Sequence, residues 1–166
     1  MKNLKTLLLS TLLTVGTFTT ILFTSCQGDK CKSVVCNNGG TCNESDGSCN
    51  CEVGFEGTNC DTESRTKLIG TYSLSGSDNL GNTYSNLATT TSASGVDKKK
   101  FTLNIAGTFI FTCTMTDKNA FIVDNVTQQG YTYSGNGTYT GTTLTIKINE
   151  ADAAGTTIYN FSGNKQ

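Results

Sequence analysis

Alternating apolar and polar residues run through the second half of this chain. One apolar side chain at every second position is the period of a β-strand with one buried face. The pattern is clearest in residues 68–74, 101–105, 109–115 and 144–148. Tyr131 with Tyr133 and Tyr159 with Phe161 alternate in the same way. No segment from residue 67 onward has a convincing helical period, so we predict a mostly β domain over residues 67–166.

Short turn sequences separate these predicted strands. They are Ala106-Gly107, Asp117-Lys118-Asn119, Gln129-Gly130, Asn136-Gly137, Thr140-Gly141 and Ala154-Gly155. Strands repeated about every ten residues and joined by tight turns favour an antiparallel β-barrel or β-sandwich of about seven to eight strands. Residues 76–97 have only weak periodicity. We therefore expect a long mobile loop or a poor edge strand there.

The start of the chain has the pattern of an export signal. Lys2 and Lys5 precede a stretch rich in Leu and Thr that runs to Phe23. The sequence Phe23-Thr24-Ser25-Cys26 resembles a bacterial lipobox, although Leu, Val or Ile is commoner at the first position. The resemblance implies that residues 1–25 are a lipoprotein signal peptide and that Cys26 carries the lipid. An ordinary secretory cleavage site and an uncleaved membrane anchor remain alternatives.

A dense cysteine framework follows. A segment this short cannot bury enough apolar surface to fold on a core, so cross-links must stabilise it. Six cysteines allow 15 connectivities. The spacing C-x4-C-x5-C-x6-C-x-C-x8-C and the Asn38-Gly39-Gly40 turn resemble the epidermal-growth-factor-like (EGF-like) module, with Phe55 as its packing aromatic. The resemblance implies disulfides Cys31–Cys42, Cys36–Cys49 and Cys51–Cys60.

The same region gives no sign of a metal site. Calcium-binding EGF-like modules have an acidic cluster before the first cysteine and an aromatic residue before the fourth. This chain has only Asp29 near the first and Gly47 near the fourth, which leaves too few oxygen ligands for Ca²⁺. The spacing also lacks the paired CxxC motifs of a zinc ribbon. We therefore expect a module of the non-calcium type, no metal and no cofactor.

These observations divide the chain into five parts. We predict a signal peptide (1–25), a lipidated cysteine with a short tether (26–30), the EGF-like module (31–60), a polar linker (61–66) and the β-domain (67–166). The start of that domain, Leu68-Ile69-Gly70-Thr71-Tyr72, resembles the opening strand of lipocalins, with Tyr in place of Trp. The whole chain resembles small surface lipoproteins of Gram-negative bacteria. This implies a lipid anchor at Cys26 in the outer membrane, on its periplasmic or cell-surface face.

Composition narrows the function classes. The chain has no His, so Ser-His-Asp and Cys-His catalytic sites cannot be assembled. Its net charge of −1 does not favour a nucleic-acid partner. Cys113 lies in an apolar stripe and is expected to be a small core residue. A carboxylate pair for glycoside hydrolysis is the remaining catalytic option, but its candidates fall where carboxylates are ordinarily solvated: Asp117, Asp124, Glu150 and Asp152.

Two hypotheses follow, and neither is an enzyme. The first is a lipid-anchored envelope protein whose disulfide-rich spacer presents the β-domain to a protein or glycan partner. The second is a lipocalin-like carrier of a small apolar ligand, which requires an internal cavity. We expect such a cavity to be bounded by Phe101, Phe109, Phe111, Leu144 and Ile146. An aromatic binding platform is an alternative to ordinary strand packing for Tyr131, Tyr133, Tyr139 and Tyr159.

Overall fold

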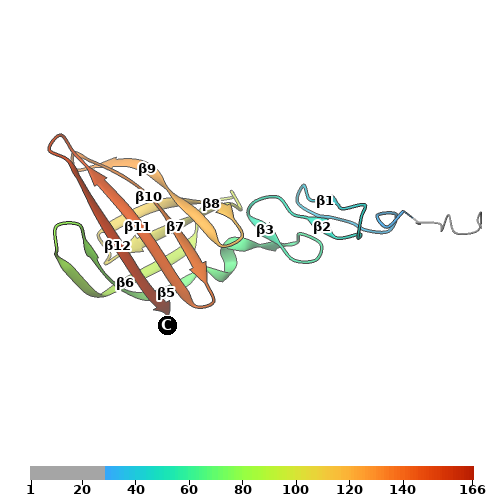
Figure 1. The fold of residues 1–166 in the computed structure, drawn as a ribbon, viewed down its shortest axis with the longest axis horizontal. Coiled ribbons are helices and arrows are strands. Elements are labelled where there is room, and N and C mark those ends of the chain that lie inside the picture. Colours follow the sequence, from blue (N-terminus) through green and yellow to red (C-terminus); the bar gives the residue numbers. More distant parts are fainter. Residues whose placement is uncertain (1–28) are drawn as a thin grey trace, which may run out of the picture.

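A computed structural model describes residues 29–166 of the chain. These residues form an elongated molecule with a narrow cysteine-rich module at one end and a β-barrel at the other (Figure 1). The predicted signal peptide and the predicted lipidation site, Cys26, lie outside the described residues. In the described residues there is no helix with the length and apolar character needed to cross a membrane.

The cysteine-rich module, residues 31–60, has almost no apolar core. It contains short strands β1 (Thr41–Cys42), β2 (Cys49–Asn50) and β3 (Phe55–Glu56), the last paired with β4 (Thr62–Glu63). Its one buried apolar side chain is Cys60, while Phe55 is half-buried. Three disulfides join Cys31 to Cys42, Cys36 to Cys49 and Cys51 to Cys60. These are the pairs that the EGF-like resemblance implies.

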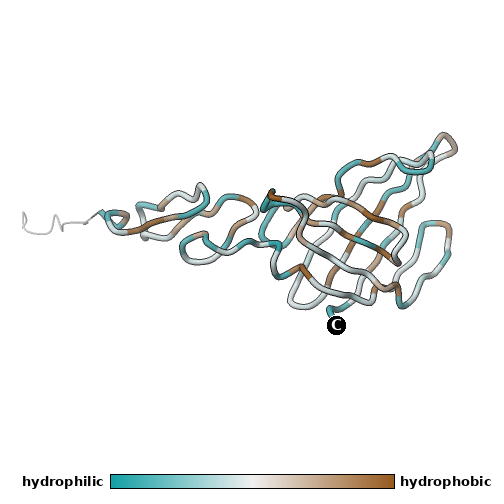
Figure 2. The backbone as a smooth tube through the Cα atoms, turned by 180° about the vertical axis from the view of Figure 1, so that it is seen from behind, coloured by the Kyte–Doolittle hydropathy of each residue, from teal (hydrophilic) through white to brown (hydrophobic). Residues whose placement is uncertain are grey.

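The β-domain is a closed barrel of eight antiparallel strands, so the prediction of a barrel or sandwich resolves to a barrel. Each strand pairs with the next, and the last pairs with the first. The strands are β5 (Gly70–Asp78), β6 (Thr83–Ala93), β7 (Lys100–Ile105), β8 (Phe109–Asp117), β9 (Ala120–Gln128), β10 (Tyr131–Thr140), β11 (Thr143–Ala151) and β12 (Thr156–Lys165). Figure 2 shows hydrophobic segments alternating with polar ones along them.

The expectation of a mobile loop or poor edge strand over residues 76–97 is wrong. Strand β6 spans 11 of these residues and pairs with both β5 and β7. Its inward positions include Thr89 and Thr91, which are 0% and 4% exposed. The Thr91 hydroxyl donates to the Leu68 carbonyl and accepts from the Gly70 amide at 3.0 Å. Buried and exposed positions do alternate along β6. A pattern of apolar residues misses this alternation because the buried positions are threonines, whose branched side chains nevertheless suit a strand.

The segment predicted as a linker, residues 61–66, connects the module to the barrel through direct contacts. It contributes β4 and the 3₁₀ helix η1 (Ser64–Lys67). Arg65 of η1 is 4% exposed, and its guanidinium donates to the carbonyls of Asp97 at 2.7 Å, Ser94 at 3.4 Å and Lys100. The Ser64 amide donates to the Gly54 carbonyl of the module at 2.8 Å. The module therefore packs against one end of the barrel.

The two ends of the barrel differ. The proximal end faces the module and consists of η1 and residues 94–99, 118–119 and 141–142. The distal end consists of the hairpins at residues 79–82, 106–108, 129–130 and 152–155. The proximal half is filled by tightly buried side chains: Leu68, Tyr72, Leu74, Phe101, Leu103, Cys113, Met115, Phe121, Tyr139, Leu144 and Ile146.

Candidate functional site

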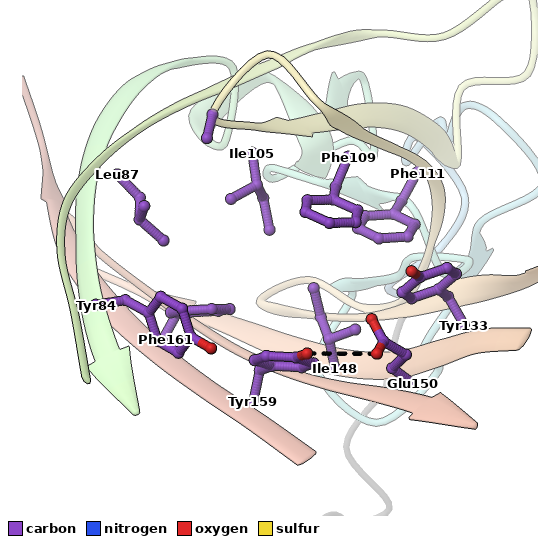
Figure 3. Close-up of a pocket in the computed structure, with 11 residues that line it drawn as sticks. Tyr84, Leu87, Ile105, Phe109, Phe111, Tyr133, Ile148, Glu150, Tyr159 and Phe161 are labelled. Carbon is purple, nitrogen blue, oxygen red and sulfur yellow. Dashed lines mark hydrogen bonds between the residues drawn. The ribbon is translucent and has the colours of Figure 1, made fainter. Parts of the chain in front are cut away.

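A cavity of about 310 Å³ occupies the distal half of the barrel and is partly open to solvent. We call it the distal cavity (Figure 3). Six of the eight strands contribute to its wall, namely β6, β7, β8, β10, β11 and β12, because alternate residues of each strand point inward. The lining residues are Tyr84, Leu87, Ile105, Ala106, Phe109, Phe111, Tyr133, Ile148, Glu150, Tyr159 and Phe161.

Six aromatic rings line the distal cavity in two groups on opposite sides (Figure 3). In the first group, the rings of Phe109 and Phe111 are stacked, and Tyr133 lies 5.5 Å from Phe111 between centroids. In the second, Tyr159 stacks on Phe161 at 6.0 Å, and the edge of Tyr84 meets Phe161 at 5.8 Å. Rings that hold one another in place present a preformed apolar surface.

Glu150 is the one charged side chain among the lining residues that the structure describes. The Tyr159 hydroxyl donates to Glu150 Oε1 at 3.4 Å, a long hydrogen bond (Figure 3). Burial and the neighbouring Glu150 carboxylate raise the pKa of Tyr133 to about 12 and that of Tyr159 to about 12. Both phenols are therefore protonated at neutral pH. The lining residues carry three hydroxyl groups, those of Tyr84, Tyr133 and Tyr159, and one carboxyl group, that of Glu150.

Asp78 lies behind Tyr84 at the distal end and has a structural role. Its carboxylate accepts hydrogen bonds from the Asn82 side chain at 2.8 Å, the Leu80 amide at 2.9 Å and the Tyr84 hydroxyl at 2.9 Å. These bonds, with that from Asn82 the most important, hold the pKa of Asp78 below its ordinary value. Asp78 thus fixes the β5–β6 turn and the position of the Tyr84 ring.

No protein-family model matches this chain, and no solved structure matches it. The site must therefore be judged from its own geometry. The described residues contain no group of three or more side chains placed to hold a metal ion. The side chains that gather at the distal cavity are aromatic and aliphatic, with a single carboxylate, and this arrangement suits noncovalent binding of a small molecule.

The predicted cavity wall is only partly correct. Phe109 and Phe111 line the distal cavity. Phe101, Leu144 and Ile146 do not, because they lie in the packed proximal half with at most 1% of their surface exposed. Strand alternation correctly places all five on the inner face, but it does not give their height along the barrel axis.

The segment for which the sequence predicted a lipocalin-like opening strand, residues 68–72, closes the proximal end. Tyr72 is 1% exposed. Its hydroxyl donates to the Leu68 carbonyl at 2.7 Å, and its ring meets the edge of Tyr139 with centroids 6.4 Å apart. Burial raises the pKa of Tyr72 well above its ordinary value. These contacts close the barrel below the distal cavity.

The four tyrosines proposed as a platform have different surroundings. Tyr133 and Tyr159 line the distal cavity, Tyr139 packs against Tyr72, and Tyr131 is 38% exposed at the rim. Packing is therefore confirmed for Tyr139, whereas a binding role for Tyr133 and Tyr159 stays a prediction. The tyrosines of the cavity alternate with polar residues like other inward-facing strand residues, so no separate sequence signal marks them.

The candidate carboxylates do not form one cluster. Asp124 accepts a hydrogen bond from Thr114 at 2.7 Å and pairs with Lys100 at 3.0 Å on the barrel wall. Asp117 precedes the proximal β8–β9 turn. Glu150 and Asp152 both lie at the distal end, where they border a second, partly open hollow.

Cys113, the one free cysteine of the described chain, is 0% exposed. Burial raises the pKa of its thiol, so the reactive thiolate is disfavoured.

Proposed function

We propose that the barrel is a non-enzymatic binding domain that takes a small, largely apolar ligand into the distal cavity. The observation that carries this proposal is the contrast within the barrel interior: the proximal half is filled, whereas the distal half leaves about 310 Å³ empty. Partly enclosed cavities of this size, with apolar walls and a few polar groups, are typical of small-molecule sites. Barrels of eight strands are just wide enough to hold one such ligand.

The preformed wall adds to this proposal. A cavity lined by stacked rings needs little ordering on binding, which limits the entropy lost when a ligand enters. Phe109 is 39% exposed although it lies against Phe111 and Tyr133. An apolar ligand would cover this ring and gain the free energy of removing its surface from water.

We propose a separate role for the cysteine-rich module, that of a spacer. Its disulfides and the buried contacts of Arg65 support a stiff connection to the barrel (Figure 1). Because the module packs on the proximal end, the distal cavity opens away from it. A lipid on Cys26 and attachment to the outer membrane are the predictions that complete this picture. Replacing Cys26 with Ala should move the protein from the membrane fraction to the soluble fraction of the producing cells, and unchanged retention would reject the anchor.

Calorimetric titration of the full chain with phenethyl alcohol, a small neutral aromatic molecule, tests the ligand proposal. Leu87 lines the cavity from β6, and Leu87→Trp should fill it and abolish binding. Ala88 is the next residue on the same strand and faces outward, so Ala88→Trp is the matched control and should bind normally. Equal binding by the two variants would reject the distal cavity as the site. Failure of the wild-type protein to bind either phenethyl alcohol or its amine counterpart, phenethylamine, would reject it as well.

A further inference from the structure

Charged side chains are distributed unevenly between the two ends of the barrel. The four distal hairpins contain no Lys or Arg, and the charged residues at their edges are Asp78, Glu150 and Asp152. Cations gather instead at the proximal end, at Lys98, Lys99, Lys100, Lys118 and Lys165. The distal end is therefore uniformly acidic, and a concave site lined by one sign of charge attracts ligands of the opposite sign.

Glu150 differs from its acidic neighbours in having few partners. Asp78 accepts several hydrogen bonds, and Asp152 accepts from the Ala154 and Gly155 amides at 2.8 Å and 3.0 Å. Glu150 has the long bond from Tyr159, and no ion pair of the described chain involves it. A carboxylate on an apolar wall is stabilised by a cation that enters beside it, because hydrogen bonds between ionised groups are the strong ones.

Aromatic rings surround this carboxylate. Tyr133 and Tyr159 flank Glu150, and the Phe161 ring stacks on Tyr159 (Figure 3). The faces of such rings attract positive charge, and an ammonium group gains most from them where it is screened from water. A metal ion would find only one carboxylate among the cavity's lining residues, whereas hard cations require several oxygen ligands.

We propose that the ligand of the distal cavity is a small organic cation, with an ammonium group at Glu150 and an apolar body among the rings of Phe109, Phe111 and Phe161. This inference rests on the proposed function and narrows it to one ligand class. A carboxylic acid is disfavoured because its anion would meet Glu150 in a site without a counter-charge. A neutral ligand would gain only the apolar part of the site.

Three probes of similar size and different charge test the inference: phenethylamine, phenethyl alcohol and phenylacetate. Calorimetric titration of the full chain should show phenethylamine binding about tenfold more tightly than phenethyl alcohol, since a charge-assisted hydrogen bond is worth about that much. Phenylacetate should bind more weakly than either. Glu150→Gln should lower the ratio of amine to alcohol affinity about tenfold.

Asp152→Asn is the matched control, because it removes a distal carboxylate that is exposed and outside the distal cavity. It should change the affinity ratio less than about twofold, as expected for a solvated charge. Thermal unfolding of both variants reports whether they fold. Equal affinity for amine and alcohol, or an unchanged ratio of amine to alcohol affinity in folded Glu150→Gln, would contradict the proposal of a cationic ligand. The proposed function would still stand. Failure of all three probes to bind would overturn both.

Discussion

The two halves of the barrel share one strand pattern but differ in what fills them. In the proximal half, inward side chains such as Phe101, Leu103 and Leu144 are fully buried and leave no room for a ligand. In the distal half, inward side chains line a cavity of about 310 Å³, and Phe109 is 39% exposed. We expect the packed half to supply most of the stability, and the distal half has room for a ligand. This division explains how a domain of this size can keep an unfilled space in its interior.

The two ends of the barrel also differ: the proximal end is closed and the distal end is open. The proximal end is closed by Tyr72 and by Arg65, whose guanidinium donates to backbone carbonyls beside the module. The distal end has no such closure, and its charges are acidic. A ligand can therefore enter from the side that faces away from the module. Stability and binding should respond separately to substitutions at the two ends.

The largest expected contrast in stability is between two phenylalanines. Phe101→Ala should lower the free energy of unfolding by about 3–5 kcal/mol, because it leaves a void in a packed core. Phe109→Ala should cost about 1 kcal/mol, since this ring is partly exposed and borders empty space. Urea unfolding measures both values. Similar losses at the two positions would contradict the division into a packed and a hollow half.

A somewhat smaller loss of stability is expected from a substitution at Arg65. Arg65→Met should destabilise the protein by about 3 kcal/mol, because the carbonyls of Ser94, Asp97 and Lys100 lose a buried charged donor. Lys99→Met, which breaks an exposed ion pair with Glu52, is the control and should cost about 0.5 kcal/mol. Urea unfolding measures the loss, and ligand affinity should be unchanged in both variants. A loss of affinity in Arg65→Met would show that the two ends are coupled.

The smallest expected effect is on the pH dependence of stability, and it comes from Asp78. Its folded pKa lies below its unfolded value of about 3.9, so the carboxylate stabilises the fold above that value. This contribution is lost as the pH falls through the lower folded pKa. In Asp78→Asn, the midpoint of thermal unfolding should therefore decline less steeply below about pH 4 than in the wild-type protein. Asp46 and Glu63, whose pKa values are also lowered, give the residual slope. Parallel pH profiles would rule out this role of Asp78.

Much of the fold could be predicted because its signals are local. The period of two in residues 101–105 and 109–115 predicted strands of the barrel wall, and five of the six predicted turns fall where strands end. The predicted turn at Asn136-Gly137 is wrong, because these residues lie inside β10 and pair with both β9 and β11. Strand β6 was missed because its buried positions are Thr89 and Thr91, which a hydrophobic pattern counts as polar. The sequence also did not predict that residues 61–66 are structured. Arg65 is held in place by hydrogen bonds to carbonyls more than 25 residues away, which no local pattern reveals.

The candidate site was harder to predict because it depends on position along the barrel axis. Phe101 and Phe109 have the same sequence signature, yet one is in the packed half and the other lines the cavity. Glu150 was expected to be solvated at a strand end. It lies instead on the cavity wall beside Tyr159, because the end of β11 reaches the open end of the barrel. Only the register of all eight strands brings these residues together.

The central claim is that the distal half of the barrel binds a small molecule, and nuclear magnetic resonance tests it most directly. Phenethyl alcohol and phenethylamine would be added in separate titrations to the isotope-labelled full chain. The account predicts that the amide signals that shift belong to residues around the distal cavity, such as Tyr84, Tyr133 and Glu150, while those of Phe101 and Leu144 stay in place. Shifts confined to the outer surface or the module, or no saturable shifts with either molecule, would contradict it.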